Sequence, residues 1–295
     1  MMTFWQTIII AIVEGLTEFL PVSSTGHMII TQSFLGIEST EFVKAFTVII
    51  QFGAILSVIV LYWNRFFRLQ PLDEFNVPTY SEGKKFVKQR VIIRKFFYRY
   101  DFYWKLLIGF LPAAVIGFLA GDFIDVLLGD VFVVALMLFI GGFVMLFVDK
   151  WFSASSQDQS IGWQRALKIG FFQCIAMIPG VSRSMATIVG GMAVKLTRKN
   201  AAEFSFFLAV PTMAAASGYK LFQLLSEQGG KDLLVQNWLL LLLGNVIAFI
   251  VALVAIRFFI DFISRYGFKA FGYYRIAVGG VILLLLGMGY NLNMM

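Results

Sequence analysis

Six apolar stretches, each long enough to cross a lipid bilayer, constrain what this chain of 295 residues can fold into. A membrane-spanning helix needs about 20 apolar residues, and inside the bilayer only a helix or a closed barrel satisfies every backbone polar group. Charged residues make up only 14% of the sequence and the mean hydropathy is +0.83, which excludes an ordinary soluble domain. We therefore predict an all-α integral membrane protein that forms a single membrane domain over residues 1–295. The six predicted spans are roughly 42–63, 104–121, 130–150, 201–225, 237–262 and 270–290.

Two further apolar regions are interrupted near their middles. Region 2–36 contains Pro21-Val22-Ser23-Ser24, and region 162–195 contains Pro179-Gly180-Val181-Ser182. Proline or glycine followed by serine ends one helix and starts another. Such a break is tolerated at membrane depth only where protein or a water-filled cavity satisfies the freed backbone groups. Each region is therefore predicted to form a re-entrant helix hairpin.

The lysines and arginines predict the orientation, because they collect on the cytoplasmic side of membrane proteins. With the basic loop 64–103 in the cytoplasm and each hairpin returning to its own side, 20 of these residues fall inside, Arg275 among them. Only Lys44, Lys220 and Lys231 fall outside, and Arg183 is left as the one strong cation assigned to the membrane interior. The first hairpin then enters from outside and the second from the cytoplasm. Loop 64–103 fits a basic surface on anionic lipid better than a nucleic-acid site.

The two breaks also resemble one another. Without gaps, EGLTEFLPVSSTGHM (14–28) aligned with QCIAMIPGVSRSMAT (173–187) matches Val22 with Val181 and Ser23 with Ser182. Halves of similar sequence and opposite orientation form an inverted repeat, whose sites lie near the midplane where broken helices meet. We predict repeats over about 1–150 and 160–295.

The breaks carry the candidate site residues. Glu14 and Glu18 lie one helical turn apart on one face, so in a low dielectric they need a cation or a shared proton. The start of a helix offers free backbone N–H groups to an anion, and Arg183 adds a two-point fork for phosphate. We predict a site for a phosphorylated anion, with a divalent metal held by Glu14 and Glu18. The expected anion-binding residues are Ser23, Thr25 and Gly26 at the first helix start, and Ser182, Arg183, Ser184 and Thr187 at the second. Ser24 and His27, also at the first helix start, are candidate catalytic residues, together with Glu18 and Arg183.

The motifs EGLTEFLPVSSTGH and PGVSRSMAT, with the late YRIAVGG, resemble the bacterial undecaprenyl pyrophosphate phosphatases of the bacitracin-resistance type. The resemblance covers nearly the whole chain, although loop 64–103 is longer than is usual in the family. It implies hydrolysis of undecaprenyl diphosphate, which recycles the lipid carrier for cell-wall synthesis, with Mg²⁺ or Ca²⁺ as cofactor. It also implies a homodimer in the bacterial cytoplasmic membrane, with its site open to the periplasm.

Several alternatives remain open at this stage. Ser24 with His27 as its base is the favoured nucleophile, against direct attack by His27 or attack by a metal-activated water. Glu18 holds the metal or orients the imidazole in this scheme, and Arg183 binds the diphosphate. Glu14 and Glu18 could instead pair with Arg183 only to hold the hairpins together. Inverted repeats with broken helices are also common in transporters, so a polyprenyl-phosphate transporter is the second hypothesis. A purely structural membrane protein would leave the buried charges unexplained.

Overall fold

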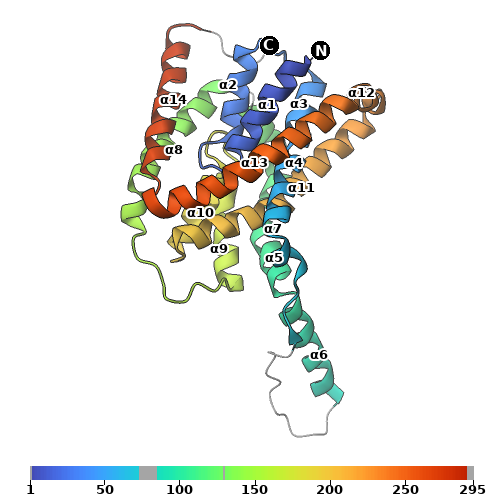
Figure 1. Ribbon diagram of the computed structural model, residues 1–295, viewed down its shortest axis with the longest axis vertical. Helices are drawn as coiled ribbons and strands as arrows, with labels where there is room; N and C mark the ends of the chain where they lie inside the picture. Colours follow the sequence, from blue (N-terminus) through green and yellow to red (C-terminus); the bar gives the residue numbers. More distant parts are fainter. Residues whose placement is uncertain (1, 73–84, 129, 291–295) are drawn as a thin grey trace.

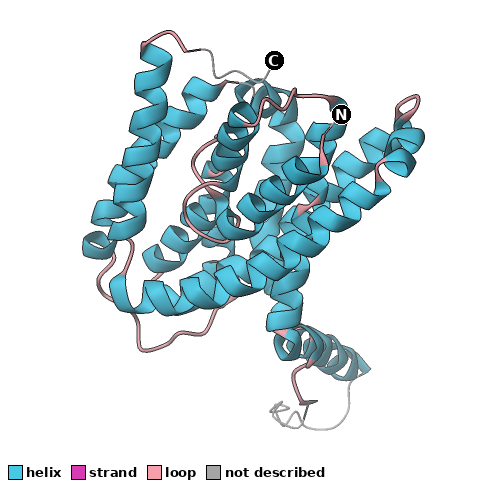
Figure 2. Cartoon of the chain, turned by 45° about the horizontal axis from the view of Figure 1, so that its top comes forward, coloured by secondary structure: helices cyan, strands magenta, loops and turns pink. Residues whose placement is uncertain are grey.

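The computed structural model describes residues 2–72, 85–128 and 130–290, and all regular structure in these ranges is helical (Figures 1 and 2). The helices are α1 (Phe4–Thr17), α2 (Ser24–Phe34), α3 (Glu41–Ile49), α4 (Gln51–Leu61), α5 (Trp63–Phe67), α6 (Lys85–Arg99), α7 (Asp101–Leu128), α8 (Val131–Trp151), α9 (Trp163–Ile175), α10 (Arg183–Ala193), α11 (Arg198–Ser226), α12 (Gly230–Gln236), α13 (Trp238–Tyr266) and α14 (Lys269–Gly287).

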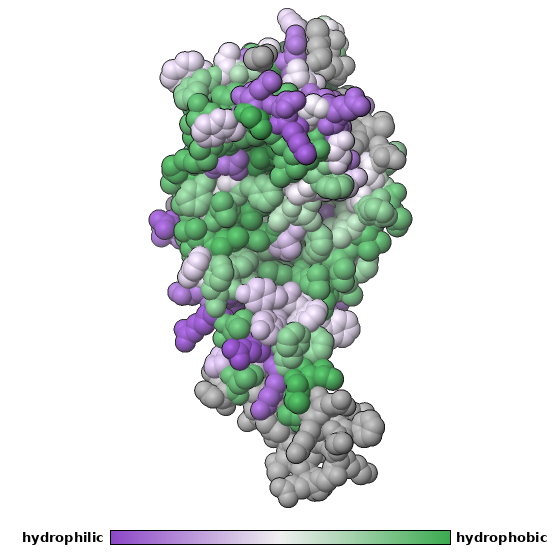
Figure 3. Space-filling model, turned by 90° about the vertical axis from the view of Figure 1, so that its right-hand side faces the viewer, coloured by the Kyte–Doolittle hydropathy of each residue, from purple (hydrophilic) through white to green (hydrophobic). Residues whose placement is uncertain are grey.

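Five helical segments in the described ranges are long and apolar enough to cross a membrane. They are Glu41–Leu61, Asp101–Gly121, Val131–Trp151, Trp238–Tyr266 and Lys269–Gly287. Apolar side chains cover the middle of the surface in Figure 3, and hydrophilic residues gather toward its two ends. This distribution is typical of a multi-pass membrane protein, in which apolar side chains face lipid tails.

The sixth predicted span, 201–225, lies within α11 but does not belong to this apolar group. Helix α11 carries Glu203 and Lys220 and buries the hydroxyl residues Ser205 and Ser217. It packs against α10, α4 and α7, so most of one face contacts protein rather than lipid. A helix in that position can keep polar residues, because its neighbours satisfy them.

The region 64–103, predicted as a loop, is largely helical where the structure describes it. Helix α5 and the 15-residue α6 lie within or across this region, and residues 73–84 lie outside the described ranges. Figure 1 shows α6 continuing beyond the lower end of α7, away from the rest of the molecule. Ile92 and Ile93 lie one helical turn before Phe96 and Phe97, so the four exposed side chains share one face of α6. Arg94 and Lys95 lie between these two pairs in the sequence and therefore on the other side of the helix, which makes α6 amphipathic.

Both interrupted regions are broken where proline and serine predicted. The first break, residues 18–23, separates α1 from α2, and the second break, residues 176–182, separates α9 from α10. The two helices of each pair pack on one another. In addition, α1 packs along α13 and α9 packs along α7, so each broken segment is held by a long helix from the other half of the chain. The two breaks therefore meet in the interior of the molecule.

Candidate functional site

The two helix starts use the same backbone device. Ser23 and Ser182 have φ of 71° and 77°, in the left-handed region that non-glycine residues rarely adopt. Each hydroxyl caps its helix: Ser23 Oγ accepts from the Gly26 N–H at 3.4 Å, and Ser182 Oγ accepts from the Met185 N–H at 3.3 Å. A strained residue persists only where its surroundings hold it, and such residues cluster at functional sites. The aligned pair Ser23 and Ser182 thus has equivalent positions in the fold.

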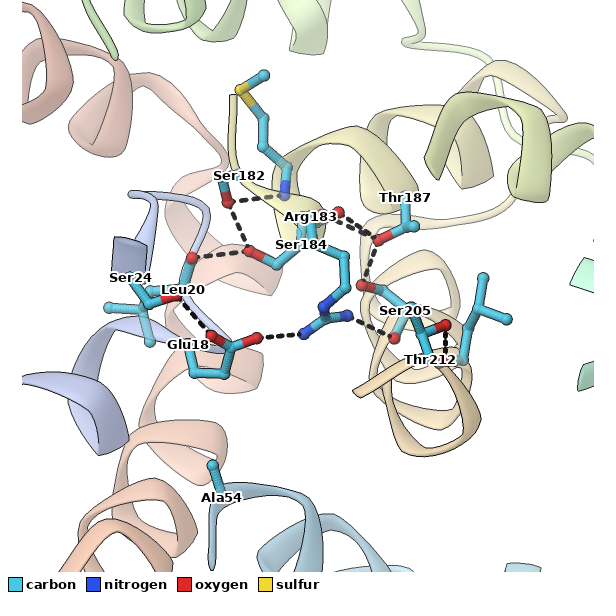
Figure 4. A network of polar contacts seen from close by, with 12 residues as sticks. Glu18, Leu20, Ser24, Ala54, Ser182, Arg183, Ser184, Thr187, Ser205 and Thr212 are labelled. Atoms are coloured by element: carbon cyan, nitrogen blue, oxygen red, sulfur yellow. Dashed lines mark hydrogen bonds and ion pairs between the residues drawn. The ribbon is translucent and has the colours of Figure 1, made fainter. Parts of the chain in front are cut away.

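Hydrogen bonds join the two breaks directly (Figure 4). Ser184 Oγ donates to the Leu20 carbonyl at 2.7 Å, which connects α10 to the first break. Ser182 Oγ lies 3.0 Å from Ser184 Oγ, so the two hydroxyls form a short chain. These contacts bring the beginnings of α2 and α10 into one polar volume, as the sequence predicted.

Glu18 lies at the centre of this volume. Its Oε2 accepts a hydrogen bond of 2.5 Å from Ser24 Oγ, and its Oε1 accepts one of 3.1 Å from Arg183 Nη2. The Glu18 and Arg183 side chains are only 6% and 13% exposed, so this is a buried ion pair. Because removing one partner of such a pair leaves an uncompensated charge, the two side chains depend strongly on each other.

Further contacts hold the Arg183 guanidinium. Nη1 donates to the Ser205 carbonyl of α11 at 3.2 Å, and the guanidinium carbon lies 5.9 Å from the centre of the Phe19 ring. The Nε–H is buried and has no hydrogen-bond partner within the described part of the chain. A buried unpaired donor is costly, so Arg183 retains unused capacity to bind an anion.

Glu14 lies one turn before Glu18 and is completely buried. Neither carboxylate oxygen has a hydrogen-bond partner among the residues that the structure describes. A buried carboxyl group in this state needs a proton or a cation. Oxygen ligands suit Mg²⁺ and Ca²⁺, so Glu14 together with Glu18 fits a divalent ion, to which substrate and water would add ligands. In the described ranges no group of three or more His, Cys, Asp or Glu side chains is arranged to hold a metal by itself.

His27 makes different contacts from those of the favoured scheme. Its Nδ1 lies 2.8 Å from the Ser23 carbonyl, which can only accept, so Nδ1 carries the proton and Nε2 is the free acceptor. The hydroxyl of Tyr274 in α14 lies 2.6 Å from Nε2 and donates to it, with the two rings nearly parallel. The acceptor for the Ser24 hydroxyl is Glu18 rather than His27. Tyr274 was missed from the sequence, although it begins the YRIAVGG motif.

Arg275 is the clearest correction to the sequence-based topology. It was assigned to the cytoplasmic side, but it is completely buried, so Arg183 is not the only cation in the interior. Its guanidinium donates to five backbone carbonyls: Pro21 at 3.1 Å, Val181 at 3.1 Å, Gly180 at 2.8 Å, Met137 at 3.1 Å and Leu138 at 3.3 Å. Broken helices leave carbonyls without partners, and a guanidinium offers five N–H donors. Arg275 therefore supports both breaks.

The remaining predicted residues are placed around this network. Thr187 is completely buried, donates to the Arg183 carbonyl at 2.8 Å and lies 2.5 Å from Ser205 Oγ, so it fastens α10 to α11. Gly26 packs on α8, where a Cβ would come within 2.9 Å of Leu138 Cδ1. Thr25 is half-buried in the first turn of α2. The structure thus brings Glu18, Ser24, Ser182, Arg183 and Ser184 together. Thr187 lies next to this group, between α10 and α11.

The fold and the site define a helical protein suited to a membrane, with a buried polar site where two helix starts meet. Comparison with known proteins identifies it further. Residues 7–281 match the family described as bacitracin resistance protein BacA, and the chain belongs to this family.

Relatives of similar length carry the name undecaprenyl-diphosphatase. The protein from Porphyromonas gingivalis is 56% identical over 292 residues, covering 99% of each chain. That from Flavobacterium johnsoniae is 51% identical over 284 residues, covering 95% of each chain, and that from Aquifex aeolicus is 40% identical over 282 residues, covering 94% of this chain and 96% of its own.

Proposed function

We propose that this protein is an undecaprenyl-diphosphatase, which hydrolyses undecaprenyl diphosphate to undecaprenyl phosphate and inorganic phosphate. This activity recycles the lipid carrier for cell-wall synthesis and gives resistance to bacitracin. The relatives' names support the reaction, and one observation in the structure carries it: Glu18 contacts both the Ser24 hydroxyl and the Arg183 guanidinium. A hydroxyl with a carboxylate acceptor, next to a phosphate-binding cation, is a set suited to phosphoryl transfer.

Ser24 is the proposed nucleophile. Its Oγ attacks the terminal phosphorus, and the bond from that phosphorus to the bridging oxygen breaks, so undecaprenyl phosphate leaves. The hydroxyl proton passes to Glu18 Oε2, which already accepts the Ser24 hydrogen bond at 2.5 Å. Water then attacks the phosphorus of the phosphoserine, the bond from phosphorus to Ser24 Oγ breaks, and inorganic phosphate is released. Glu18 returns its proton to Ser24 Oγ, which restores the hydroxyl and the carboxylate. This scheme replaces His27 by Glu18 as the group that accepts the proton.

Charge neutralisation is the other requirement of phosphoryl transfer, because the transition state spreads negative charge over the phosphoryl oxygens. Arg183 would bind these oxygens, helped by the backbone N–H groups at the starts of α2 and α10. Glu14 and Glu18 would hold Mg²⁺ or Ca²⁺, and that cation supplies additional positive charge to the diphosphate when bound. The unpartnered oxygens of Glu14 support a cation site at this position.

His27 keeps a supporting role in this proposal. Its Nε2 accepts from Tyr274, so a direct attack by His27 would first require this hydrogen bond to break. Once the same hydrogen bond opens, Nε2 of the neutral imidazole can orient the attacking water in the second step. Direct attack by His27 remains the alternative that mutational analysis must separate.

The proposed topology is an inverted repeat with two re-entrant hairpins, α1–α2 and α9–α10, in the bacterial cytoplasmic membrane. Three features support it: α2 and α10 each have 11 residues, their caps share a positive φ, and each broken segment packs on a long helix of the other half. The polar site would open to the periplasm, and α6 would lie in the cytoplasm. The active form would be a homodimer.

Phosphate release by the purified protein tests the function. Long-chain polyprenyl diphosphate should release phosphate, and a chelator should abolish the release until Mg²⁺ or Ca²⁺ is returned. No release from any polyprenyl diphosphate in the presence of metal would contradict the proposed reaction. Release that persists in chelator would support the proposed reaction and show that it needs no divalent metal.

A further inference from the structure

An apolar groove lies beside the polar site. It has a volume of about 370 Å³ and runs between α2, α8 and α14, which neighbour one another in Figure 1. Its walls include Ile29 and Ile30 of α2, Val131 of α8, and Val278 and Ile282 of α14. The lining residues of α14 recur at three- and four-residue spacing from Tyr274 to Leu285, so one face of this helix forms a wall about 16 Å long.

Tyr274 connects the groove to the candidate site. Its side chain lines the groove, while its hydroxyl bonds to His27 in the first turn of α2, three residues after Ser24. Beyond Tyr274, the only other hydroxyl group among the described lining residues belongs to Ser33. The surface therefore changes from polar to apolar at the His27–Tyr274 pair.

We infer that this groove holds the first isoprene units of a polyprenyl diphosphate while its terminal phosphate lies at Ser24. The inference rests on the proposed function, because the tail is covalently attached to the diphosphate and must leave the polar site through neighbouring apolar surface. The groove is an apolar surface that begins at the His27–Tyr274 pair, and its length along α14 suits a linear hydrocarbon chain. The rest of the tail stays in the bilayer.

The groove should orient the substrate more than it attracts it. A lipid tail moving from the bilayer into the groove exchanges one apolar environment for another, so burial alone supplies little free energy. Holding the first carbons in one place, however, fixes the direction from which the diphosphate enters, and such positioning lowers the barrier to reaction. The groove thus distinguishes prenyl diphosphates from diphosphates without an apolar chain.

Filling the groove tests this assignment. Val281, which is 55% exposed and lines the groove, is changed to phenylalanine; Val254→Phe is the matched control, because Val254 is 66% exposed on α13 and away from the groove. Phosphate release is measured with a long polyprenyl diphosphate and with isopentenyl diphosphate, which has a single isoprene unit. Val281→Phe should lower kcat/KM for the long substrate at least about 10-fold and leave release from the short one within about twofold, because lost positioning weakens transition-state stabilisation. Val254→Phe should change neither.

Two results would overturn the groove assignment: an unchanged kcat/KM for the long substrate in Val281→Phe, or equal losses with both substrates. Unaltered melting of Val281→Phe in detergent ensures that either result is informative. Ala277→Phe, on the same wall, provides a second variant with the same expected outcome.

A second measurement reads binding without turnover. A polyprenyl phosphate with a diazirine on its first isoprene unit should crosslink to residues 29–34 of α2 and 277–285 of α14. Crosslinks elsewhere in a protein that releases phosphate would contradict binding of the tail in the groove and leave the proposed hydrolysis supported. Crosslinks in the groove of a protein that releases no phosphate would contradict the proposed hydrolysis and support the groove as the binding site for the first isoprene units. An unlabelled phospholipid that competes equally would identify the groove as a general acyl-chain site and reject the assignment.

Discussion

Single residues at the breaks have distinct roles, although their sequence motifs present them together. Ser23 and Ser182 use their hydroxyls to cap helices, and Thr187 holds α10 on α11. Ser24 and Arg183 both contact Glu18, so their positions depend on one carboxylate. A motif of neighbouring hydroxyl residues therefore divides into those that shape the site and those that face its centre.

The contact between Ser24 and Glu18 makes a prediction about turnover. Ser24→Ala should lower kcat at least about 100-fold, the lower end of what one positioned proton-transfer pair contributes. Glu18→Gln should have a similar effect, and the double variant should be little worse than either, because residues that act as a unit are not additive. The measurement is kcat and KM for polyprenyl diphosphate in detergent.

Thr17→Ala is the control for this series, since Thr17 is a half-buried neighbour of Glu18 whose hydroxyl donates to the Val13 carbonyl of its own helix. It should retain most of the activity. Substantial turnover by Ser24→Ala, together with an inactive His27→Ala, would assign the attack to histidine or water instead of serine.

At the scale of the elements, the two breaks are stable because other helices satisfy their backbone groups. Arg275 reaches carbonyls of both breaks and of α8 from its position in α14, and Gly141 leaves room for its guanidinium by lacking a Cβ. Without these donors the carbonyls of Pro21, Gly180 and Val181 would lose partners in a low-dielectric interior. Helix α14 therefore sets the relative position of α2 and α10 as well as lining the groove.

Replacing Arg275 should destabilise the whole fold. Arg275→Met leaves five buried carbonyls short of a donor, and we expect a loss of at least about 3 kcal/mol in the free energy of unfolding. Arg275→Lys should recover only part of it, because an ammonium group has three donors instead of five. Thermal unfolding in detergent measures both.

Lys269→Met is the matched control, because Lys269 is exposed at the start of the same helix. Its unfolding should stay close to that of the unchanged protein. Wild-type stability in Arg275→Met would show that water or relaxed backbone satisfies the carbonyls instead.

In the whole molecule, each broken segment packs on a long helix from the other half of the chain. Helix α1 packs on α13 and α9 packs on α7, so neither broken segment depends only on its own half. This packing places the polar site deep between apolar helices, where a charged group is costly unless it is paired. The buried pair of Glu18 and Arg183 meets that condition with one partner from each half.

The orientation in the membrane can be tested by thiol labelling of intact cells. In a Cys174→Ala background, Ser155→Cys and Arg94→Cys should be shielded from an impermeant reagent, and Gly229→Cys should be labelled. The expectation follows from the lysine and arginine distribution, which stays strongly one-sided after Arg275 is moved to the interior. Permeabilised cells serve as the control, since all three cysteines should then react. Labelling of Arg94→Cys in intact cells would reverse the orientation.

The sequence by itself determined the helical class, the position of both breaks and the pairing of Ser23 with Ser182. It offered a pairing of Glu14 and Glu18 with Arg183 only as the alternative to a metal site, and the structure shows that pairing for Glu18. These features follow from local composition and periodicity.

The tertiary structure alone decided that Arg275 supports the breaks, that His27 faces Tyr274 and that Ser24 faces Glu18. Arg275 and Pro21 are 254 residues apart, and His27 and Tyr274 are 247 apart. Local sequence patterns assign an arginine near the end of a predicted span to the cytoplasmic side. Only the packing of α14 against both breaks surrounds it with carbonyls, and that packing depends on the shapes of many helices at once.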